Sequence, residues 1–227
     1  MPKDILISTS MLSSDFTKLG DELQAVVAAG SDWIHWDVMD GHFTDPLTFG
    51  EVVLRAVRHL TDCFFDTHLM LTNPEKQMPR FADAGADGIS IHLEATDDPI
   101  ALLDDIRKRG LKSGLVVNPP TPLDEIERLL EHCDTMMLMG VMPGYSGQKY
   151  GEETSRRIAA VREMIDRQGL PTLIEVDGGI NEQTIGEAVG AGVDVLVTAS
   201  YVFSHPQGYA AAMEGLREIA AALPERR

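Results

Sequence analysis

Short apolar runs recur along the chain, and longer amphipathic stretches separate them. Each run is five to eight residues long and is bounded by turn-forming residues, which is typical of buried strands and too short for most helices. We predict eight strands, at residues 5–9, 32–39, 63–70, 88–94, 112–118, 135–141, 172–177 and 194–199.

The stretches between these strands carry the signals of helices. Asn73-Pro74, Asp98-Pro99 and Thr121-Pro122 each place a polar cap before a proline whose φ already suits a first helical turn. A loose repeat also joins a helix end to an acidic turn and an apolar strand, as expected of successive αβ units. It occurs at AGSDWIHWD (29–37), AGADGISIH (84–92), HCDTMMLMGV (132–141) and AGVDVLVTAS (191–200).

Eight strands that alternate with eight helices predict an α/β protein with a (β/α)8 TIM-barrel fold, formed as a single domain over residues 1–227. An open doubly wound sheet is the structural alternative, but no GxGxxG motif follows the first strand. The hydrophobic fraction of 44% is enough to fill one such core.

The composition excludes several classes of partner. A formal charge of −17 opposes binding to nucleic acid and to an anionic membrane surface. No apolar run approaches the roughly 18 residues that span a bilayer. The start MPKDILIST lacks the features of a secretory signal, so we expect a cytoplasmic protein. Cys63 and Cys133 have no CxxC spacing and are expected to be buried thiols rather than a disulfide or a zinc site.

The segment HWDVMDGHF places two histidines and two aspartates in and after the second predicted strand. A buried carboxylate without a partner costs several kcal/mol, so it needs a counter-ion, a strand end or a chemical role. Because side chains alternate along a strand, His35 and Asp37 share one face. Asp66 and His68 share a face of the third strand in the same way, and Asp177 ends the seventh. Each residue alone fits a hydrogen-bonded core or a turn, but convergence at strand ends favours a metal or catalytic site.

Imidazole and carboxylate ligands together suit zinc, iron(II), manganese or cobalt, whereas calcium and magnesium prefer sites made only of oxygen. Asp66 is the weakest candidate ligand, because its depth in the strand favours a structural role or the support of a ligand. Other strand ends also carry candidate groups, namely His92, Glu94, Asn118 and Met139.

The loops after the last three strands suit an anion. VDGGI follows the seventh strand, with Asn181 opening a helix, and TASY follows the eighth. Barrels often bind phosphate at these positions through backbone N–H groups, although a tight turn is the simpler interpretation of two glycines. MPGYSGQKY, residues 142–150, suits a mobile cover over such a site, with an ordinary surface loop as the alternative.

Taken together, these segments resemble the ribulose-phosphate 3-epimerase family. The matching segments run in the family's order over nearly the whole chain, and they are highly specific as a set. They are SMLSSDF (10–16), HWDVMDGHF (35–43), LTFG (47–50), DTHLM (66–70), HLE (92–94), VNPPTP (117–122), MPGYSGQKY (142–150), EVDGGI (175–180) and ASYVF (199–203).

The resemblance implies a ribulose-phosphate-binding barrel with one divalent metal ion (Zn, Fe(II), Mn or Co) and no organic cofactor. It implies that His35, Asp37, His68 and Asp177 hold the metal and that the two aspartates are the acid/base pair. Ser10 and His68 would touch the sugar of a phosphorylated ketose. The implied phosphate contacts are Gly144, Tyr145, Ser146, Gly147, Gly178, Gly179, Ala199 and Ser200, and the implied pocket wall is Met39, Met70 and Met139, for which core filling is the alternative.

The implied reaction explains the need for two aspartates. The C3 proton of a 2-ketose phosphate lies next to a carbonyl, so a base can remove it if the enediolate charge is stabilised. Inversion then requires a proton from the opposite face of the planar intermediate. One carboxylate for each face would interconvert D-ribulose 5-phosphate and D-xylulose 5-phosphate.

Several residues around the substrate depart from the family pattern, although none is a proposed ligand or catalytic carboxylate. They are Thr44-Asp45-Pro46 for Val-Pro-Asn, Gly140 for Ser or Thr, Met142 for a polar residue, Ser146 and Ala199 for Gly, and Thr9 for Pro. These changes leave D-allulose 6-phosphate or another phosphorylated ketose open as the substrate. Two further hypotheses are a non-catalytic sugar-phosphate-binding protein and a metal-independent isomerase or lyase. A closed homo-oligomer is the general expectation.

Overall fold

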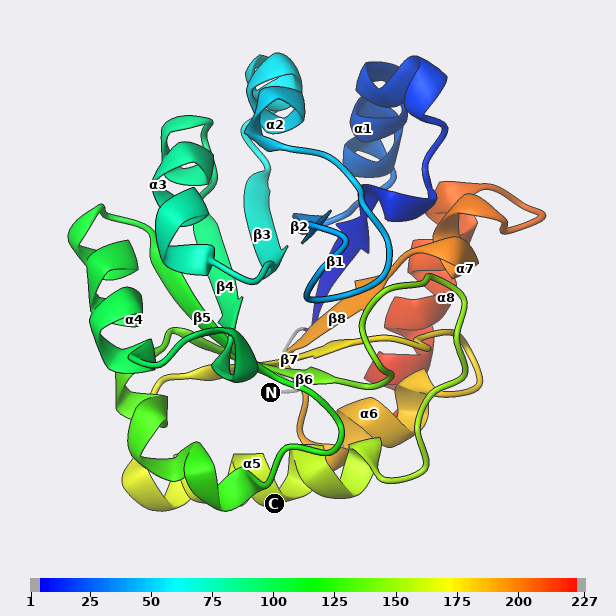
Figure 1. Cartoon of the computed structure of the whole chain (residues 1–227). Helices are drawn as coiled ribbons and strands as arrows, with labels where there is room; N and C mark the ends of the chain where they lie inside the picture. Colours follow the sequence, from blue (N-terminus) through cyan, green and yellow to red (C-terminus); the bar gives the residue numbers. More distant parts are fainter. Residues whose placement is uncertain (1–4, 224–227) are drawn as a thin grey trace.

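Eight parallel strands close into a barrel in the order β1 to β8 (Figure 1). The computed structural model describes residues 5–223, so the predicted domain bounds at 1 and 227 lie outside the described residues. All eight predicted strands are present, with ends within two residues of the predicted ones, which confirms the (β/α)8 barrel and excludes the open sheet. The strands are β1 (Leu6–Ser10), β2 (Trp33–Met39), β3 (Phe64–Met70), β4 (Gly88–His92), β5 (Lys112–Val117), β6 (Thr135–Met139), β7 (Leu173–Asp177) and β8 (Val195–Thr198).

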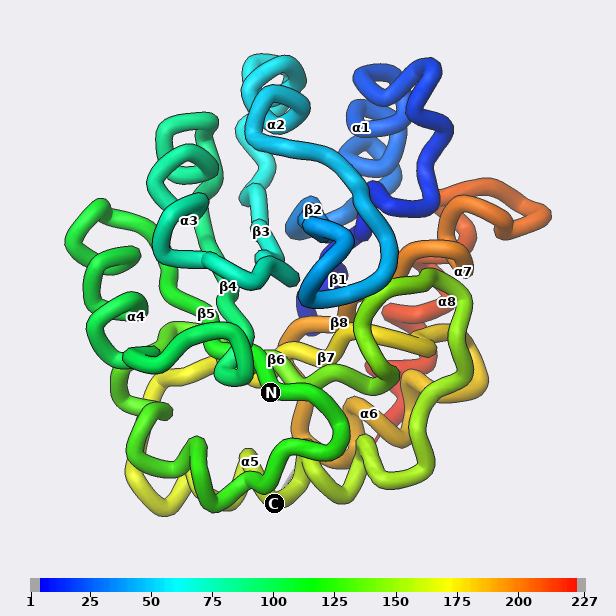
Figure 2. The backbone as a smooth tube through the Cα atoms, viewed as in Figure 1, coloured from blue at the N-terminus to red at the C-terminus, as the bar shows by residue number. Residues whose placement is uncertain are grey.

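Helices surround the barrel and connect successive strands (Figure 2). The main apolar core lies between the strands and these helices, and it includes Ile34, Trp36 and Val38 of β2. Strand alternation therefore turns His35 and Asp37 toward the barrel interior. The helices are α1 (Leu19–Ala28), α2 (Glu51–Val57), α3 (Pro74–Asp83), α4 (Pro99–Lys108), α5 (Thr154–Gln168), α6 (Ile185–Ala191), α7 (Ser200–Phe203) and α8 (Tyr209–Ala221), with 3-10 segments η1 (Met11–Ser13), η2 (Phe16–Lys18), η3 (Arg58–Leu60), η4 (Leu93–Ala95), η5 (Leu123–Glu125) and η6 (Glu127–His132).

The proline signals for helix starts are confirmed at two of three places. α3 and α4 begin at Pro74 and Pro99, as predicted. After Thr121-Pro122 the predicted α-helix is wrong, because the two 3-10 segments η5 and η6 occupy this connection. The hydroxyl of Thr121 donates to the carboxylate of Glu94 and so does not cap a helix.

The predicted helix start at Asn181 is also wrong. The side-chain oxygen of Asn181 accepts the backbone N–H of Gln183 at 2.9 Å, which forms a local turn. α6 begins only at Ile185. Asparagine stabilises turns and helix starts through the same type of side-chain bond, so the sequence alone does not separate the two.

The acidic turn of the sequence repeat makes the same contact four times at the amino-terminal ends of the strands. Each aspartate precedes an even-numbered strand, and its carboxylate accepts a backbone N–H of the preceding odd-numbered strand at 2.7–3.0 Å. Its own N–H donates to the carbonyl of that same partner residue. The pairs are Asp32 with Ile7, Asp87 with Phe65, Asp134 with Ser113 and Asp194 with Ile174.

An arginine completes each of these contacts, which we call the aspartate clasps. The arginine comes from the helical segment that precedes the odd-numbered strand around the barrel, and it lies 2.7–3.4 Å from the carboxylate. Each clasp therefore joins two strands and a helix, and the four together hold the barrel at the end opposite the candidate ligands. The arginines are Arg217 for Asp32, Arg58 for Asp87, Arg107 for Asp134 and Arg162 for Asp194.

Both cysteines are free thiols, as predicted. Cys133 is buried, as predicted. Cys63 is only partly buried, so the prediction that it is a buried thiol was wrong. Among residues 5–223, no helix combines the length and the apolar character needed to cross a bilayer.

We predict that Asp194→Ala lowers the free energy of unfolding by about 3 kcal/mol, because it removes the acceptor of the Ile174 N–H and the buried carboxylate that pairs with Arg162. Asp166→Ala is the matched control, because it removes another carboxylate that pairs with Arg162 but is 65% exposed. Asp166→Ala should lower the free energy of unfolding by less than about 0.5 kcal/mol. Urea unfolding of both variants measures the difference, and equal losses would contradict the clasp.

Candidate metal centre

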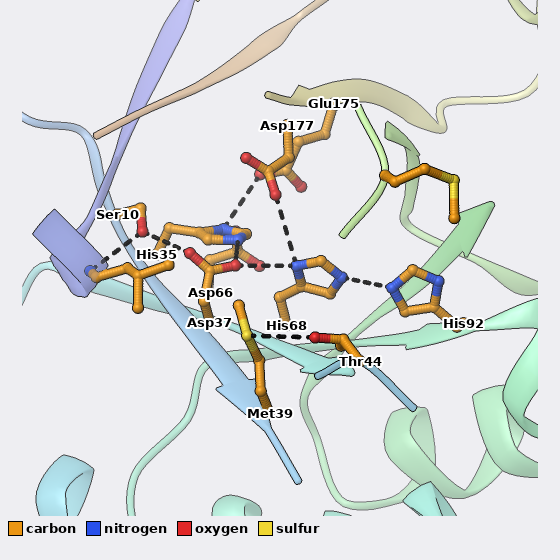
Figure 3. A network of polar contacts seen from close by, with 12 residues as sticks. Ser10, His35, Asp37, Met39, Thr44, Asp66, His68, His92, Glu175 and Asp177 are labelled. Carbon is orange, nitrogen blue, oxygen red and sulfur yellow. Dashed lines mark hydrogen bonds and ion pairs between the residues drawn. The ribbon is translucent and has the colours of Figure 1, made fainter. Parts of the chain in front are cut away.

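The four predicted ligands meet at the carboxyl ends of three strands (Figure 3). One potential ligand atom from each of His35, Asp37, His68 and Asp177 lies within 4.8 Å of the others. Asp37 Oδ1 is 3.3 Å from His35 Nε2 and 3.2 Å from His68 Nδ1. Asp177 Oδ2 is 3.8 Å from the same His68 nitrogen. The structure brings the four residues together, and their role as metal ligands stays a prediction.

The donor set fits a divalent cation. The Nε2 atom of His35 is fully buried and has no hydrogen-bond partner among the described residues. Buried polar atoms in proteins are almost always satisfied, so an orphaned lone pair here indicates a ligand. A cation among two imidazoles and two carboxylates would use that lone pair and offset the buried negative charge.

Asp66 contacts His35 through the ring nitrogen that does not face Asp37. Its Oδ2 atom lies 2.6 Å from His35 Nδ1. A hydrogen bond to this carboxylate places the imidazole proton on Nδ1 and leaves the Nε2 lone pair directed at the centre. This geometry agrees with the supporting role predicted for Asp66.

Glu175 of β7 is a candidate that the sequence reasoning did not single out. It is fully buried, and neither carboxyl oxygen has a hydrogen-bond partner among the described residues. Burial, together with the negative charge of Asp66, raises the pKa of Glu175 well above its usual value. Its position two residues before Asp177 places both on the inward face of the strand, and this alternation was the available signal.

The two proposed catalytic aspartates differ in acidity. Burial alone would raise the pKa of Asp37, but the nearby imidazoles of His35 and His68 hold it well below its usual range. Ser10 Oγ also donates to Asp37 Oδ2 at 2.5 Å, which stabilises the carboxylate. Burial and the negative charge of Asp37 raise the pKa of Asp177 to about 6. Carboxyl groups whose environments separate their pKa values are typical of acid/base pairs.

A pocket of about 320 Å³ extends from the two aspartates to the loops after β6, β7 and β8. Its lining contains every residue predicted to contact phosphate, together with the three predicted wall methionines, whereas His68 is fully buried. The predicted residues in the lining are Ser10, Asp37, Met39, Met70, Met139, Gly144, Tyr145, Ser146, Gly147, Asp177, Gly178, Gly179, Ala199 and Ser200.

Glycines in the loops after β6 and β7 allow close backbone packing at the predicted phosphate region. Gly179 has a φ of +76°, and a Cβ there would lie 2.3 Å from the backbone nitrogen of Tyr150. Gly140 is similarly restricted, because its Cβ would lie 2.6 Å from the carbonyl oxygen of Gly178. A side chain at Gly140 or Gly179 would therefore require these loops to move apart.

The predicted cover, residues 142–150, contains no helix or strand. Gln148 Nε2 donates to the carbonyl oxygens of Met142 and Tyr145 at 2.8 and 2.9 Å, which closes the loop on itself. The hydroxyls of Ser146 and Ser13 lie 2.8 Å apart and connect the loop to the segment after β1. Movement of this loop stays a prediction.

Comparisons with known proteins agree with this geometry. The sequence profile of the ribulose-phosphate 3 epimerase family matches residues 6–203. The chain belongs to this family. It is 45% identical over 219 residues to ribulose-phosphate 3-epimerase of Synechocystis sp., covering 96% of this chain and 95% of the relative. It is also 45% identical over 217 residues to the Mycobacterium tuberculosis protein of the same name, covering 96% and 93% of the two chains. We therefore identify this family member as an epimerase.

More distant structures share the fold alone. Orotidine 5'-phosphate decarboxylase from Pyrococcus horikoshii superposes with a TM-score of 0.68 at 16% identity, covering 96% of this chain and all of that one. The tryptophan synthase α-subunit from Pyrococcus furiosus gives 0.66 at 14% identity, covering 97% of this chain and 98% of that one. At these identities the likeness shows the barrel and not the chemistry.

We predict that His35→Ala abolishes stoichiometric zinc binding and that Asp66→Asn weakens it by roughly 10- to 100-fold, because the latter removes the charge that orients His35. His42→Ala is the matched control, since the His42 ring bonds to the carbonyl of Asp40 in its own loop. Competition against a chromophoric chelator measures the three affinities. Tight stoichiometric zinc in His35→Ala would show that this residue is not a ligand.

Proposed function

We propose that the protein is a metal-dependent ribulose-phosphate 3-epimerase that interconverts D-ribulose 5-phosphate and D-xylulose 5-phosphate. The observation that carries the proposal is the placement of Asp37 and Asp177, which differ in acidity, beside a metal-type donor set in one pocket. Relatives named for this activity, at 41–45% identity over most of the chain, support the choice of substrate.

Phosphate would be bound without a cationic side chain. No Lys or Arg occurs among the described residues that line the pocket. The loops after β6, β7 and β8 instead supply glycine backbone and the hydroxyl of Ser200. Clustered backbone N–H groups bind anions through their partial positive charge, which suits a chain with a formal charge of −17.

The two aspartates would move the proton on C3. A divalent cation held by His35, Asp37, His68 and Asp177 supplies Lewis-acid stabilisation of the negative charge that develops on the substrate. Asp37, whose carboxylate accepts the Ser10 hydroxyl, takes the proton from one face of C3. Asp177 delivers a proton to the other face, and the two roles reverse for the opposite direction.

The methionines would complete the reaction chamber. Met39, Met70 and Met139 are almost fully buried and line the pocket beside the two aspartates. Their thioether side chains adapt to irregular shapes and carry no strong hydrogen-bonding group. They exclude water from the carboxylates without competing for the proton, which protects the enediolate from side reactions.

We expect proton NMR of the zinc-loaded protein with D-ribulose 5-phosphate in D₂O to show xylulose 5-phosphate with deuterium at C3. Proton exchange with solvent follows from removal and return of the C3 proton by carboxyl groups. D-allulose 6-phosphate in a parallel sample tests the six-carbon alternative. The proposed substrate is wrong if only the six-carbon sugar turns over, and epimerisation is wrong if neither does.

We predict that Asp177→Asn lowers kcat by about 1,000-fold or more, because an amide can neither accept nor deliver the proton. The melting temperature should stay within a few degrees of wild type, since the side chain is 17% exposed and isosteric. Turnover is measured at saturating zinc so that a weaker metal affinity does not mimic the effect. Asp166→Asn, at an exposed carboxylate, is the control and should turn over normally.

A further inference from the structure

His92 is a buried imidazole that the proposed chemistry does not use. It ends β4 and is fully buried, with its ring centroid 4.6 Å from that of Phe43. Its Nε2 atom lies 2.8 Å from Nε2 of His68 (Figure 3). Two imidazole nitrogens at this distance form a hydrogen bond only if one carries a proton and the other does not.

Glu94 lies at the other side of the His92 ring. Its Oε2 atom is 3.3 Å from His92 Nδ1. Its Oε1 atom accepts the backbone N–H of Asn118 at 2.8 Å and the hydroxyl of Thr121. A carboxyl group that accepts from all of these donors acts as an anion. It therefore favours a proton on the His92 nitrogen that it faces.

The positions of the protons follow along this chain of contacts. A proton on His92 Nδ1 leaves His92 Nε2 as the acceptor, so the proton between the two rings belongs to His68 Nε2. His68 Nδ1 then carries a lone pair, and it faces Asp37 and Asp177 at 3.2 and 3.8 Å. In the opposite arrangement His68 Nδ1 would donate a proton to Asp37, so this nitrogen could not bind the proposed cation, and an unprotonated His92 nitrogen would face the Glu94 carboxylate.

We propose that His92 and Glu94 are positioning residues that fix the tautomer and orientation of His68, so that its Nδ1 lone pair is directed at the metal centre. This inference rests on the proposed metal-dependent function. Asp66 does the same for His35 through the opposite ring nitrogen. Because both nitrogens of His68 are engaged, its contact with a sugar would be made through ring carbons.

The direct test is nitrogen NMR of zinc-loaded protein labelled with ¹⁵N in histidine. We expect His68 to be protonated at Nε2, with a through-bond coupling from this nitrogen to His92 Nε2. Protonation of His68 at Nδ1, or the absence of the coupling with zinc bound, would overturn the proposal. The measurement needs no turnover, so its outcome is independent of whether the protein epimerises D-ribulose 5-phosphate.

Variants provide the second test. We expect His92→Phe to weaken zinc binding by roughly 10- to 100-fold and to lower kcat more than it changes KM, because it removes the acceptor for His68. Glu94→Ala should act in the same direction, and His92→Gln should restore part of the loss because its amide can both accept and donate. His132→Phe is the control, since His132 pairs with Asp104 at 3.3 Å on the outside of the barrel.

Zinc affinities equal to wild type in both His92→Phe and Glu94→Ala would overturn the proposal. An equal loss in His132→Phe would do the same, because it would show a general effect of removing a histidine. If His92→Phe does not fold, Glu94→Ala and the spectrum of the wild-type protein decide the question.

Discussion

Four carboxyl groups surround His35 and His68 inside the barrel, and this concentration of acid is the constraint that organises the site. Asp37, Asp66, Glu175 and Asp177 cannot all be ionised side by side without a large electrostatic cost. Burial and the charge of Asp66 raise the pKa of Glu175 well above its usual value, whereas the imidazoles of His35 and His68 hold the pKa of Asp37 below its usual range and Ser10 donates to its carboxylate. The difference in acidity between the proposed base and acid is therefore a result of how the acids pack, and a cation completes the balance of charge.

Much of the fold could be predicted because hydrophobic patterning and strand alternation are local properties. The eight strands and the helices that begin at Pro74 and Pro99 follow directly from such patterns. The 3-10 segments after β5 could not be predicted from local patterns, because the hydroxyl of Thr121 binds Glu94, which is 27 residues away along the chain. The arginines of the clasps were also missed for this reason, since each meets its aspartate only after the barrel has closed.

In the candidate site, too, local patterns predicted some features, and others depend on contacts that form only in the folded barrel. Strand alternation placed His35, Asp37 and His68 on inward faces, and the resemblance supplied their expected roles. Glu175 could have been found from its spacing to Asp177, yet its raised pKa depends on burial and on the nearby charge of Asp66, which no sequence pattern expresses. The pairing of His68 with His92 depends on the register of β3 against β4, which becomes visible only in the structure.

The clasp between Asp32 and Arg217 joins residues that are 185 positions apart. Arg217 of α8 also donates to the carbonyl oxygens of Ile5, just before β1, and Gly30, in the turn between α1 and β2. The contacts of Arg217 with the segments around β1 and β2 therefore cannot form until α8 has been synthesised. Although domains fold as the chain leaves the ribosome, the first two strands of this barrel can complete their contacts only after β8, which pairs with β1, and α8 have been synthesised.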